Sequence, residues 1–244
     1  MDIVLFGAEA HELEKKASAV QGINVVTAAP DVVVCYGGDG TLLTAELRWP
    51  GVPKVPIRNS RRGQRCIPHP PGQILERLAK NDLVRCEYTK IECVVHRQAD
   101  ANPFCFLTAM NEVNVHMAHI NLAVRFSLWL NDEPYASGKE IIGDGFVVCT
   151  PFGSTAYFNQ ITRGFFYAGL GIAFKYTAEH TNHLVVPETT VVRVHISRGP
   201  ARLAFDNAPE YSEITEGDEL IIRKHPHPAV LLTWAPMSHP SDDF

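Results

Sequence analysis

A glycine-rich stretch with one carboxylate, residues 37–41 (GGDGT), carries the clearest chemistry in the sequence. Successive backbone N–H groups of such a turn, together with the N-terminus of a following helix, can surround a phosphate. The lysine of the common phosphate-binding loop motif is absent, and the charge of Asp39 would repel a ligand that is only a phosphate. A carboxylate at this place suits a site that handles a proton or a metal ion next to phosphate. The alternative is a tight turn capped by an aspartate.

Two adjacent polar residues, Asn111 and Glu112, interrupt an apolar segment in AMNEVNVHM. Polar side chains in such a segment must find hydrogen-bond partners. An amide beside a carboxylate can hold the hydroxyls of a sugar or a ring that carries an amide. The alternative is a polar pair on an edge strand.

The most unusual stretch is residues 143–160, GDGFVVCTPFGSTAYFNQ. Gly-Asp-Gly precedes an apolar strand, and Thr-Pro-Phe-Gly-Ser-Thr-Ala-Tyr then supplies small residues, hydroxyl groups and backbone N–H groups. Such a segment can wrap closely around a nucleotide.

The elements that must position these residues alternate between strand and helix over residues 1–97. The run DVVVCY at 31–36 predicts a buried strand, and the segments 42–49 and 73–80 have helical composition. This alternation predicts a parallel sheet with helices on its faces, a three-layer α/β domain. The turn at 37–41 then lies at the carboxyl edge of the sheet, where such folds bind ligands.

From residue 98 on, the pattern predicts a mostly antiparallel, β-rich domain of the β-sandwich type. Residues 122–130 alternate with the period of a half-buried strand, and NDEP predicts a hairpin turn into residues 135–140. We expect the β-rich domain to span 98–225. Residues 226–244 form a C-terminal strand and tail, which could return to the N-terminal domain.

Composition excludes several classes of partner. The formal net charge is -5 at pH 7, so no overall basic field attracts nucleic acid. No apolar run approaches the roughly 20 residues of a membrane span, and we expect no membrane partner. The six cysteines contain no C-x-x-C pair, which indicates reduced core thiols in a cytoplasmic protein.

In this order, GGDGT, then NE, then GDG-(x)4-TPxGSTAY, the sequence resembles the NAD kinase family. The family belongs to a superfamily with the diacylglycerol and sphingosine kinases, which share GGDGT but not TPxGSTAY. The resemblance implies an α/β domain plus a β-rich domain, and an ATP-dependent kinase that converts NAD to NADP. It also implies small-molecule nucleotides as partners, ATP with Mg²⁺ bridging its phosphates, and a homodimer or homotetramer.

The resemblance also implies roles for individual residues. Asp39 would be the catalytic carboxylate that orients or deprotonates the 2′-hydroxyl of the NAD adenosine ribose. The ATP phosphates would be held by Gly37, Gly38, Gly40 and Thr41. The residues implied to bind NAD are Asn111, Glu112, Asp144, Thr155, Ala156, Tyr157, Gln160 and Asn207. No set of side chains is implied as a metal site of its own.

The sequence departs from the family after GGDGT, where a segment similar to GIN-x-G-x-LGFL is replaced by PIRNSRRGQRCIPH. Its arginines could bind phosphate instead, because guanidinium groups match phosphate oxygens, and Arg58 and Arg61 are the phosphate-binding candidates nearest GGDGT. Two further readings therefore stay open. One is a kinase of the same fold acting on another nucleoside, dinucleotide or lipid alcohol. The other is a non-catalytic dinucleotide-binding regulatory protein, which retained Asp39 disfavours.

Overall fold

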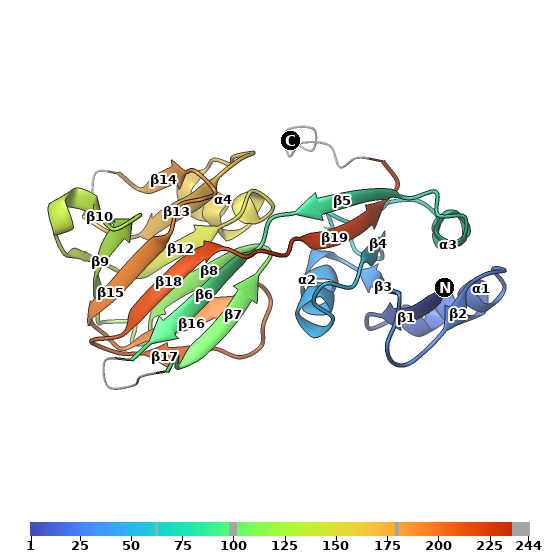
Figure 1. The fold of residues 1–244 in the computed structure, drawn as a ribbon, viewed down its shortest axis with the longest axis horizontal. Helices are drawn as coiled ribbons and strands as arrows, with labels where there is room; N and C mark the ends of the chain where they lie inside the picture. Colours follow the sequence, from blue (N-terminus) through green and yellow to red (C-terminus); the bar gives the residue numbers. More distant parts are fainter. Residues whose placement is uncertain (62, 98–101, 179–180, 236–244) are drawn as a thin grey trace. The chain divides into compact units, whose positions relative to one another are not determined.

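The structure, a computed structural model, describes residues 1–61, 63–97, 102–178 and 181–235 (Figure 1). The chain forms two compact units. Unit 1 comprises Met1–Tyr88 together with the described residues from Pro228 on, and unit 2 comprises Thr89–His227. The fold is mixed α/β in unit 1 and antiparallel β in unit 2, which confirms the fold class expected from the sequence.

Unit 1 is built on a six-stranded sheet with the order β2-β1-β3-β4-β19-β5. The first five of these strands run parallel, and β5 pairs antiparallel with β19. The strands are β1 Asp2–Phe6, β2 Asn24–Val25, β3 Val32–Gly37, β4 Lys54–Arg58, β5 Val84–Tyr88 and β19 Ala229–Thr233.

Helices cover both faces of this sheet. The 3₁₀ helix η1 (Ala10–Leu13), α1 (Glu14–Ser18) and α3 (Pro71–Ala79) share an apolar core with alternate residues of the strands, including Val55 and Ile57 of β4. Lys54 of the same strand points to the opposite face, because successive side chains of a strand alternate, and it bonds to α2 (Asp39–Arg48). Unit 1 is therefore a three-layer α/β arrangement.

Helix α2 begins earlier than the sequence indicated. Helical composition predicted a helix over 42–49, whereas the helix starts at Asp39 and ends at Arg48. The N–H groups of Thr41 and Leu42 both bond to the carbonyl oxygen of Gly38, which closes the first turn. The carboxylate of the GGDGT stretch is thus a residue of the first helical turn.

Unit 2 consists of two antiparallel sheets. One has the order β10-β9-β15-β18-β6-β7, with β11 also paired to β9, and the other has the order β14-β13-β12-β8-β16-β17. The strands of the first sheet are β6 Ile91–His96, β7 Cys105–Ala109, β9 Val124–Leu130, β10 Glu133–Pro134, β11 Ile141–Gly143, β15 Val192–Arg198 and β18 Glu219–Lys224. Those of the second are β8 Glu112–Met117, β12 Gly145–Cys149, β13 Leu170–Lys175, β14 His183–Val186, β16 Ala201–Phe205 and β17 Ser212–Ile214. Three short helical segments complete the unit: η2 Tyr135–Gly138, η3 Gly153–Thr155 and α4 Tyr157–Thr162.

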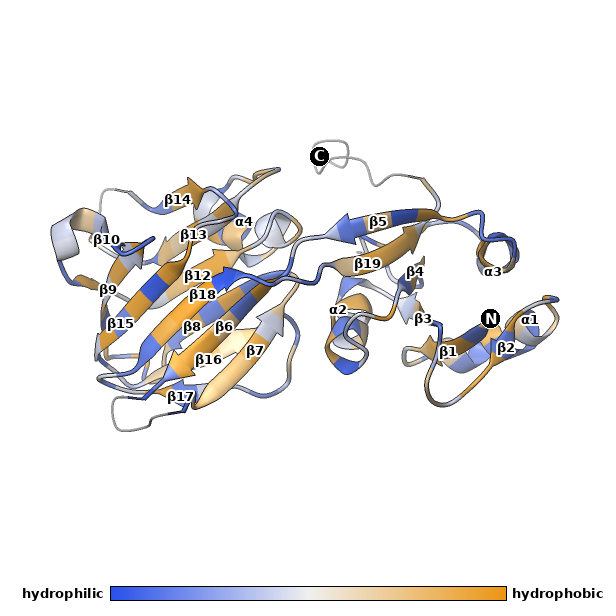
Figure 2. Ribbon diagram, in the orientation of Figure 1, coloured by the Kyte–Doolittle hydropathy of each residue, from blue (hydrophilic) through white to orange (hydrophobic). Residues whose placement is uncertain are grey.

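The core of unit 2 lies between the inward faces of its two sheets, and Figure 2 shows the apolar strands that supply it. Phe126 of β9 and Phe146 of β12 meet there with ring centroids 4.9 Å apart. The alternation predicted over 122–130 is confirmed, because β9 buries every second residue. The hairpin turn at NDEP was expected to lead into a strand over residues 135–140, and that expectation is wrong. Pairing ends at Pro134, and η2 follows, with Ala136 and Ser137 at φ 51° and 58°.

No helix in the described part of the chain is long and apolar enough to cross a membrane. All six cysteines lie among the described residues and are free thiols, four of them buried and two half-buried.

Candidate active site

In unit 1 the glycine-rich stretch forms the turn between β3 and α2. Strand β3 ends at Gly37, Gly38 is extended at φ −118° and ψ −169°, and α2 begins at Asp39. Because β1, β3 and β4 run parallel, the turn lies at the carboxyl edge of the sheet, as predicted. The first N–H groups of a helix have no partner inside the helix and carry partial positive charge. The turn can therefore hold an anion.

The glycines of this turn also allow close packing inside the protein, because a side chain at either position would crowd a neighbouring residue. A Cβ atom on Gly37 would lie 2.3 Å from Oγ1 of Thr41, and one on Gly38 would lie 3.1 Å from Cβ of Ser60. A Cβ atom on Gly63 would in turn lie 3.3 Å from Cα of Gly38. The loop after β4 therefore packs directly against the turn, and its N–H at Asn59 bonds to the carbonyl oxygen of Gly37 at 2.8 Å.

The same loop holds the carboxylate of Asp39. Oδ1 accepts the backbone N–H of Arg65 at 2.9 Å, and Oδ2 accepts that of Gln64 at 3.2 Å. The thiol of Cys66 lies 3.6 Å from Oδ1 and donates to it. Burial, and then the negative charge of Asp39, raises the pKa of the Cys66 thiol to about 12. The thiol therefore stays protonated and keeps its hydrogen for this bond.

The arginines of the loop differ in exposure. The side chains of Arg58 and Arg61 are exposed, and Arg65 is half-buried. Neither Arg58 nor Arg61 forms an ion pair with any residue that the structure describes. Arg62 lies outside the described residues. Arg58 and Arg61 can therefore meet a ligand phosphate without first breaking an ion pair with a described residue.

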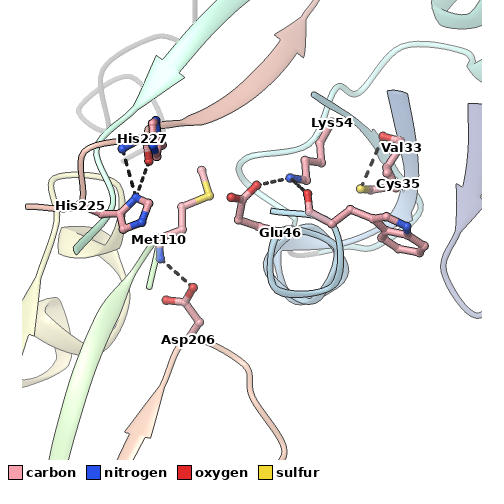
Figure 3. Close-up of polar contacts among 9 residues, drawn as sticks. Val33, Cys35, Glu46, Lys54, Met110, Asp206, His225 and His227 are labelled. Carbon is pink, nitrogen blue, oxygen red and sulfur yellow. Dashed lines mark hydrogen bonds and ion pairs between the residues drawn. The ribbon is translucent and has the colours of Figure 1, made fainter. Parts of the chain in front are cut away.

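Helix α2 is fastened to the sheet by a buried ion pair between Lys54 of β4 and Glu46 of α2 (Figure 3). Both side chains are almost completely buried. Lys54 also donates to the carbonyl oxygen of Trp49 at 2.7 Å, just after the end of the helix. Removing one partner of such a pair leaves an uncompensated buried charge, which destabilises strongly. The pair therefore fixes the position of α2 against β4.

In unit 2 the Asn111–Glu112 stretch is held by Asp206. The Asp206 carboxylate accepts the backbone N–H groups of Met110, Asn111 and Glu112 at 2.7, 2.7 and 3.2 Å, and Figure 3 shows the first of these bonds. Asp206 also donates its own N–H to the carbonyl oxygen of Glu112. It adopts a φ of 44°, a conformation that aspartate tolerates better than most residues. Asp206 thus fixes the backbone of the turn between β7 and β8.

The TPFGS segment packs against the same turn. The hydroxyl of Thr150 donates to the carbonyl oxygen of Met110 at 2.6 Å, and its N–H bonds to that of Asn111 at 2.9 Å. A Cβ atom on Gly153 would lie 2.3 Å from the carbonyl oxygen of Asn111, so only glycine fits. Residues that are 40 to 96 positions apart in the sequence therefore form one hydrogen-bonded cluster.

A buried acid and a buried base belong to this region. Burial and the charge of Asp206 raise the pKa of Glu112 to about 8, and no described residue bonds to its buried Oε2 atom. Burial lowers the pKa of Lys175 to about 7, against the opposing effect of Asp144 and Glu112. Lys175 donates to the side chain of Asn114 and, at 2.7 Å, to the carbonyl oxygen of Val115. The two groups therefore lose much of their charge near neutral pH.

A pocket of about 490 Å³ opens beside Lys175. Its ammonium lies 5.1 Å from the ring centroid of Tyr157, which offers an aromatic wall. The lining residues are His116, Tyr157, Gln160, Ile161, Arg163, Phe174, Lys175, Tyr176, Thr177 and Asn182. The pocket thus combines aromatic faces, amides and cationic groups, which suits a polar ring with an attached anion.

The structure groups the predicted residues of unit 2 in two places. Asn111 and Glu112 lie in the cluster around Asp206, and the exposed Asn207 follows that residue. Tyr157 and Gln160 line the pocket. Asp144 begins the turn into β12 and bonds through its N–H to the carbonyl oxygen of Lys175 at 2.9 Å. Thr155 ends η3 and Ala156 lies between η3 and α4, and both are half-buried.

Sequence reasoning missed two residues of this region, Lys175 and Asp206. Thr150 belongs to the TPxGSTAY stretch, but no separate role was expected for it. A lysine at the end of the apolar run LGIAFK is the signal that could have identified Lys175, because a lysine at that place needs a buried partner or a ligand.

Comparisons with known proteins first define the fold. The yeast NADH kinase solved with NADH superimposes with a TM-score of 0.78 at 15% identity, covering 88% of this chain and 67% of that one. An NAD kinase from Archaeoglobus fulgidus solved with ATP gives a TM-score of 0.73 at 18% identity, covering 98% and 93%. The two units therefore have the fold of the NAD kinases.

Sequence relatives then give the family. The chain is 30% identical over 215 residues to the NAD kinase of Thermomicrobium roseum, covering 84% of this chain and 71% of the relative. It is 29% identical over 237 residues to that of Koribacter versatilis, covering 90% and 80%. No family model matches the sequence. The chain belongs to the NAD kinase family and is a nucleotide-binding kinase.

Proposed function

We propose that the protein transfers the terminal phosphoryl group of ATP to the 2′-hydroxyl of the NAD adenosine ribose, which makes NADP. One observation carries this proposal: the carboxylate of Asp39 stands in the first turn of α2, beside the Gly37–Gly38 turn, and is held in place by the following loop. A protein that only binds dinucleotides gains nothing from a carboxylate beside phosphate. Retained Asp39 therefore supports catalysis.

The roles proposed for the residues are those that the family resemblance implies. Asp39 would orient the attacking hydroxyl and take its proton. Gly37, Gly38 and Gly40 would hold ATP phosphates with backbone N–H groups, and Thr41, whose N–H bonds to Gly38, would use its hydroxyl. Arg58 and Arg61 would add guanidinium contacts. Phosphoryl transfer depends mainly on such positioning and on neutralising charge.

The acceptor side would be supplied by unit 2. Asn111 and Glu112 would hold a ribose and the edge of the adenine. Tyr157 and Gln160 would bind in the pocket, where Tyr157 offers its ring. The remaining proposed contacts with NAD are Asp144, Thr155, Ala156 and Asn207.

Mg²⁺ fits these residues as an ion that arrives with ATP. Magnesium is usually bound through substrate phosphates and one or two carboxylates rather than by a protein cage. Among the described residues no group of three or more His, Cys, Asp or Glu side chains could hold a metal, so the ion would be held mainly through the ATP phosphates. When bound, the ion would neutralise charge on the phosphates. The six free thiols support a cytoplasmic location, and we propose a homodimer or homotetramer, as the family resemblance implies.

The test is to incubate the purified protein with ATP, Mg²⁺ and single acceptors, and to identify the product by mass. We expect phosphorylated NAD and a loss of turnover of about 100-fold or more in Asp39→Asn. An Asp39→Asn variant with the turnover of the wild type would remove Asp39 from the mechanism.

A second candidate, a kinase of the same fold with another acceptor, is favoured by the charge of the pocket. Its described lining residues, which leave out residues 179 and 180, include Lys175 and Arg163 but no Asp or Glu. The acceptor panel therefore includes NADH, nucleosides, diacylglycerol and the dinucleotide in which a carboxylate replaces the carboxamide of NAD. Faster phosphorylation of that carboxylate dinucleotide than of NAD would favour the second candidate.

A further inference from the structure

The loop that replaces the usual family segment makes a close contact with Asp39. Three consecutive residues of the loop reach its carboxylate: Gln64 and Arg65 through backbone N–H groups, and Cys66 through its thiol. Of these three contacts with Asp39, only that of Cys66 comes from a side chain. A substitution at Cys66 can therefore remove its contact directly. Its side chain is 5% exposed.

The arrangement distinguishes the two oxygens of the carboxylate. Oδ1 receives two donors, the N–H of Arg65 and the thiol of Cys66, while Oδ2 receives only the N–H of Gln64. A carboxylate offers about four acceptor positions, two on each oxygen. Oδ1 is therefore saturated, and Oδ2 keeps one position for an incoming hydroxyl.

The loop is held at this distance by its packing. Gly63 lies against Gly38 so closely that a Cβ atom on Gly63 would be 3.3 Å from Cα of Gly38. Beyond Cys66, Ile67 exchanges backbone hydrogen bonds with β4, through Pro56 at 2.7 Å and Arg58 at 3.0 Å. The backbone on both sides of Cys66 is thus fixed, which holds its Cα atom at a constant place beside Asp39.

We infer that Cys66 is a positioning residue: by occupying Oδ1 of Asp39, its thiol turns Oδ2 toward the acceptor hydroxyl. This inference rests on the proposed function, in which Asp39 meets that hydroxyl. Burial keeps the thiol protonated, so it can serve as a donor throughout the neutral pH range. The substrates need not touch Cys66, and its loss should therefore change turnover rather than substrate affinity.

The experiment compares Cys66→Val, which keeps the volume and removes the donor, with Cys66→Ser, which keeps a donor. We expect the valine variant to lower kcat about 3- to 10-fold, the scale of one hydrogen bond. The KM values for ATP and NAD should stay within about 2-fold, since uniform binding is unchanged. The serine variant should recover most of the turnover. Cys93→Ala, in a buried position of β6 in unit 2, controls for the loss of a core thiol.

A double-mutant cycle separates positioning from general damage. If Cys66 acts through Asp39, then Cys66→Val should have no further effect on the residual turnover of Asp39→Asn. Equal losses in both backgrounds, or a serine variant as slow as the valine variant, would overturn the inference. If urea unfolding shows that the valine variant does not fold, Cys66→Ala takes its place. A kcat of the serine variant below that of the alanine variant would then refute the positioning role of Cys66. A wild-type protein that does not phosphorylate NAD, or a fully active Asp39→Asn variant, would instead count against the proposed function.

Discussion

Replacing Asp206 with asparagine removes a charge that three consecutive N–H groups share, and it keeps the size of the side chain. In the wild type, one oxygen accepts the N–H groups of Asn111 and Glu112, and the other accepts that of Met110. Asparagine has one acceptor oxygen and one NH₂ group. Its oxygen can keep two of the bonds, and its NH₂ group then faces the third donor.

The magnitude follows from these three bonds. A hydrogen bond to a charged group contributes about 1.5–3 kcal/mol, and a neutral one about 1 kcal/mol. Losing one bond and weakening two therefore costs about 4 kcal/mol. Removing the negative charge beside Glu112 returns less than about 1 kcal/mol of this at neutral pH, because burial is the larger cause of the raised pKa of that carboxyl and, with a pKa of about 8, it is mostly protonated there. We expect Asp206→Asn to lower the free energy of unfolding of unit 2 by about 3 kcal/mol.

The assay combines urea unfolding with the KM values for NAD and ATP. The turn at residues 110–112 should loosen, so we expect the KM for NAD to rise about 10-fold or more while the KM for ATP changes little. Asp218→Asn is the matched control, because the buried Asp218 carboxylate accepts one backbone N–H, that of Thr215, in the same unit. It should cost less stability and leave both KM values unchanged. A loss of less than about 1 kcal/mol in Asp206→Asn, with an unchanged KM for NAD, would refute the reasoning.

Three further predictions concern the same regions. Gly153→Ala places a Cβ atom 2.3 Å from the carbonyl oxygen of Asn111 and should lower the free energy of unfolding in urea by at least about 2 kcal/mol. Gly72→Ala is the control, because a Cβ atom there meets open space in helix α3, and it should be neutral or stabilising. Similar effects of the two substitutions would contradict the close packing at Gly153. Because folding raises the pKa of Glu112 from 4.5 to about 8, the wild type loses stability as pH rises through that range. Glu112→Gln should therefore gain about 3 kcal/mol relative to the wild type between pH 6 and pH 9, and a constant difference across these pH values would count against the shift. Exchanging both Arg58 and Arg61 for glutamine should weaken ATP binding about 10-fold and flatten its salt dependence in calorimetric titrations; an unchanged affinity at low and high salt would leave these side chains as solvated surface.

The parts of the fold that follow from local patterns could be predicted from the sequence. The run DVVVCY followed by glycines indicated β3 and a turn at the carboxyl edge, and the alternation over 122–130 indicated β9. The start of α2 was missed because Gly40 and Thr41 are poor helix formers, so the helix seemed to begin at Leu42. Its actual start at Asp39 is stabilised by the bonds that Thr41 and Leu42 make to Gly38.

The contacts that organise the candidate site could not be predicted from local patterns. Asp206 reaches the turn at 110–112 because β16 pairs with β8, with Phe205 opposite Val113. A single sequence does not reveal the pairing of strands that are about 90 residues apart. The contact between Asp39 and residues 64–66 was hidden for another reason. Two of its three hydrogen bonds come from backbone N–H groups, which residue types do not reveal, and the third comes from the thiol of Cys66, a residue that gave no local signal.

The place of β19 has a consequence for the biosynthesis of the protein. This strand, Ala229–Thr233, lies between β4 and β5 in the sheet of unit 1, although it follows all of unit 2 in the chain. During translation the contiguous segment of unit 2 can therefore complete its two sheets while unit 1 still lacks a central strand. Until β19 leaves the ribosome, β4 and β5 each present an unpaired edge, which other chains could pair with. The half of the protein that is synthesised first is thus the half that can finish folding last.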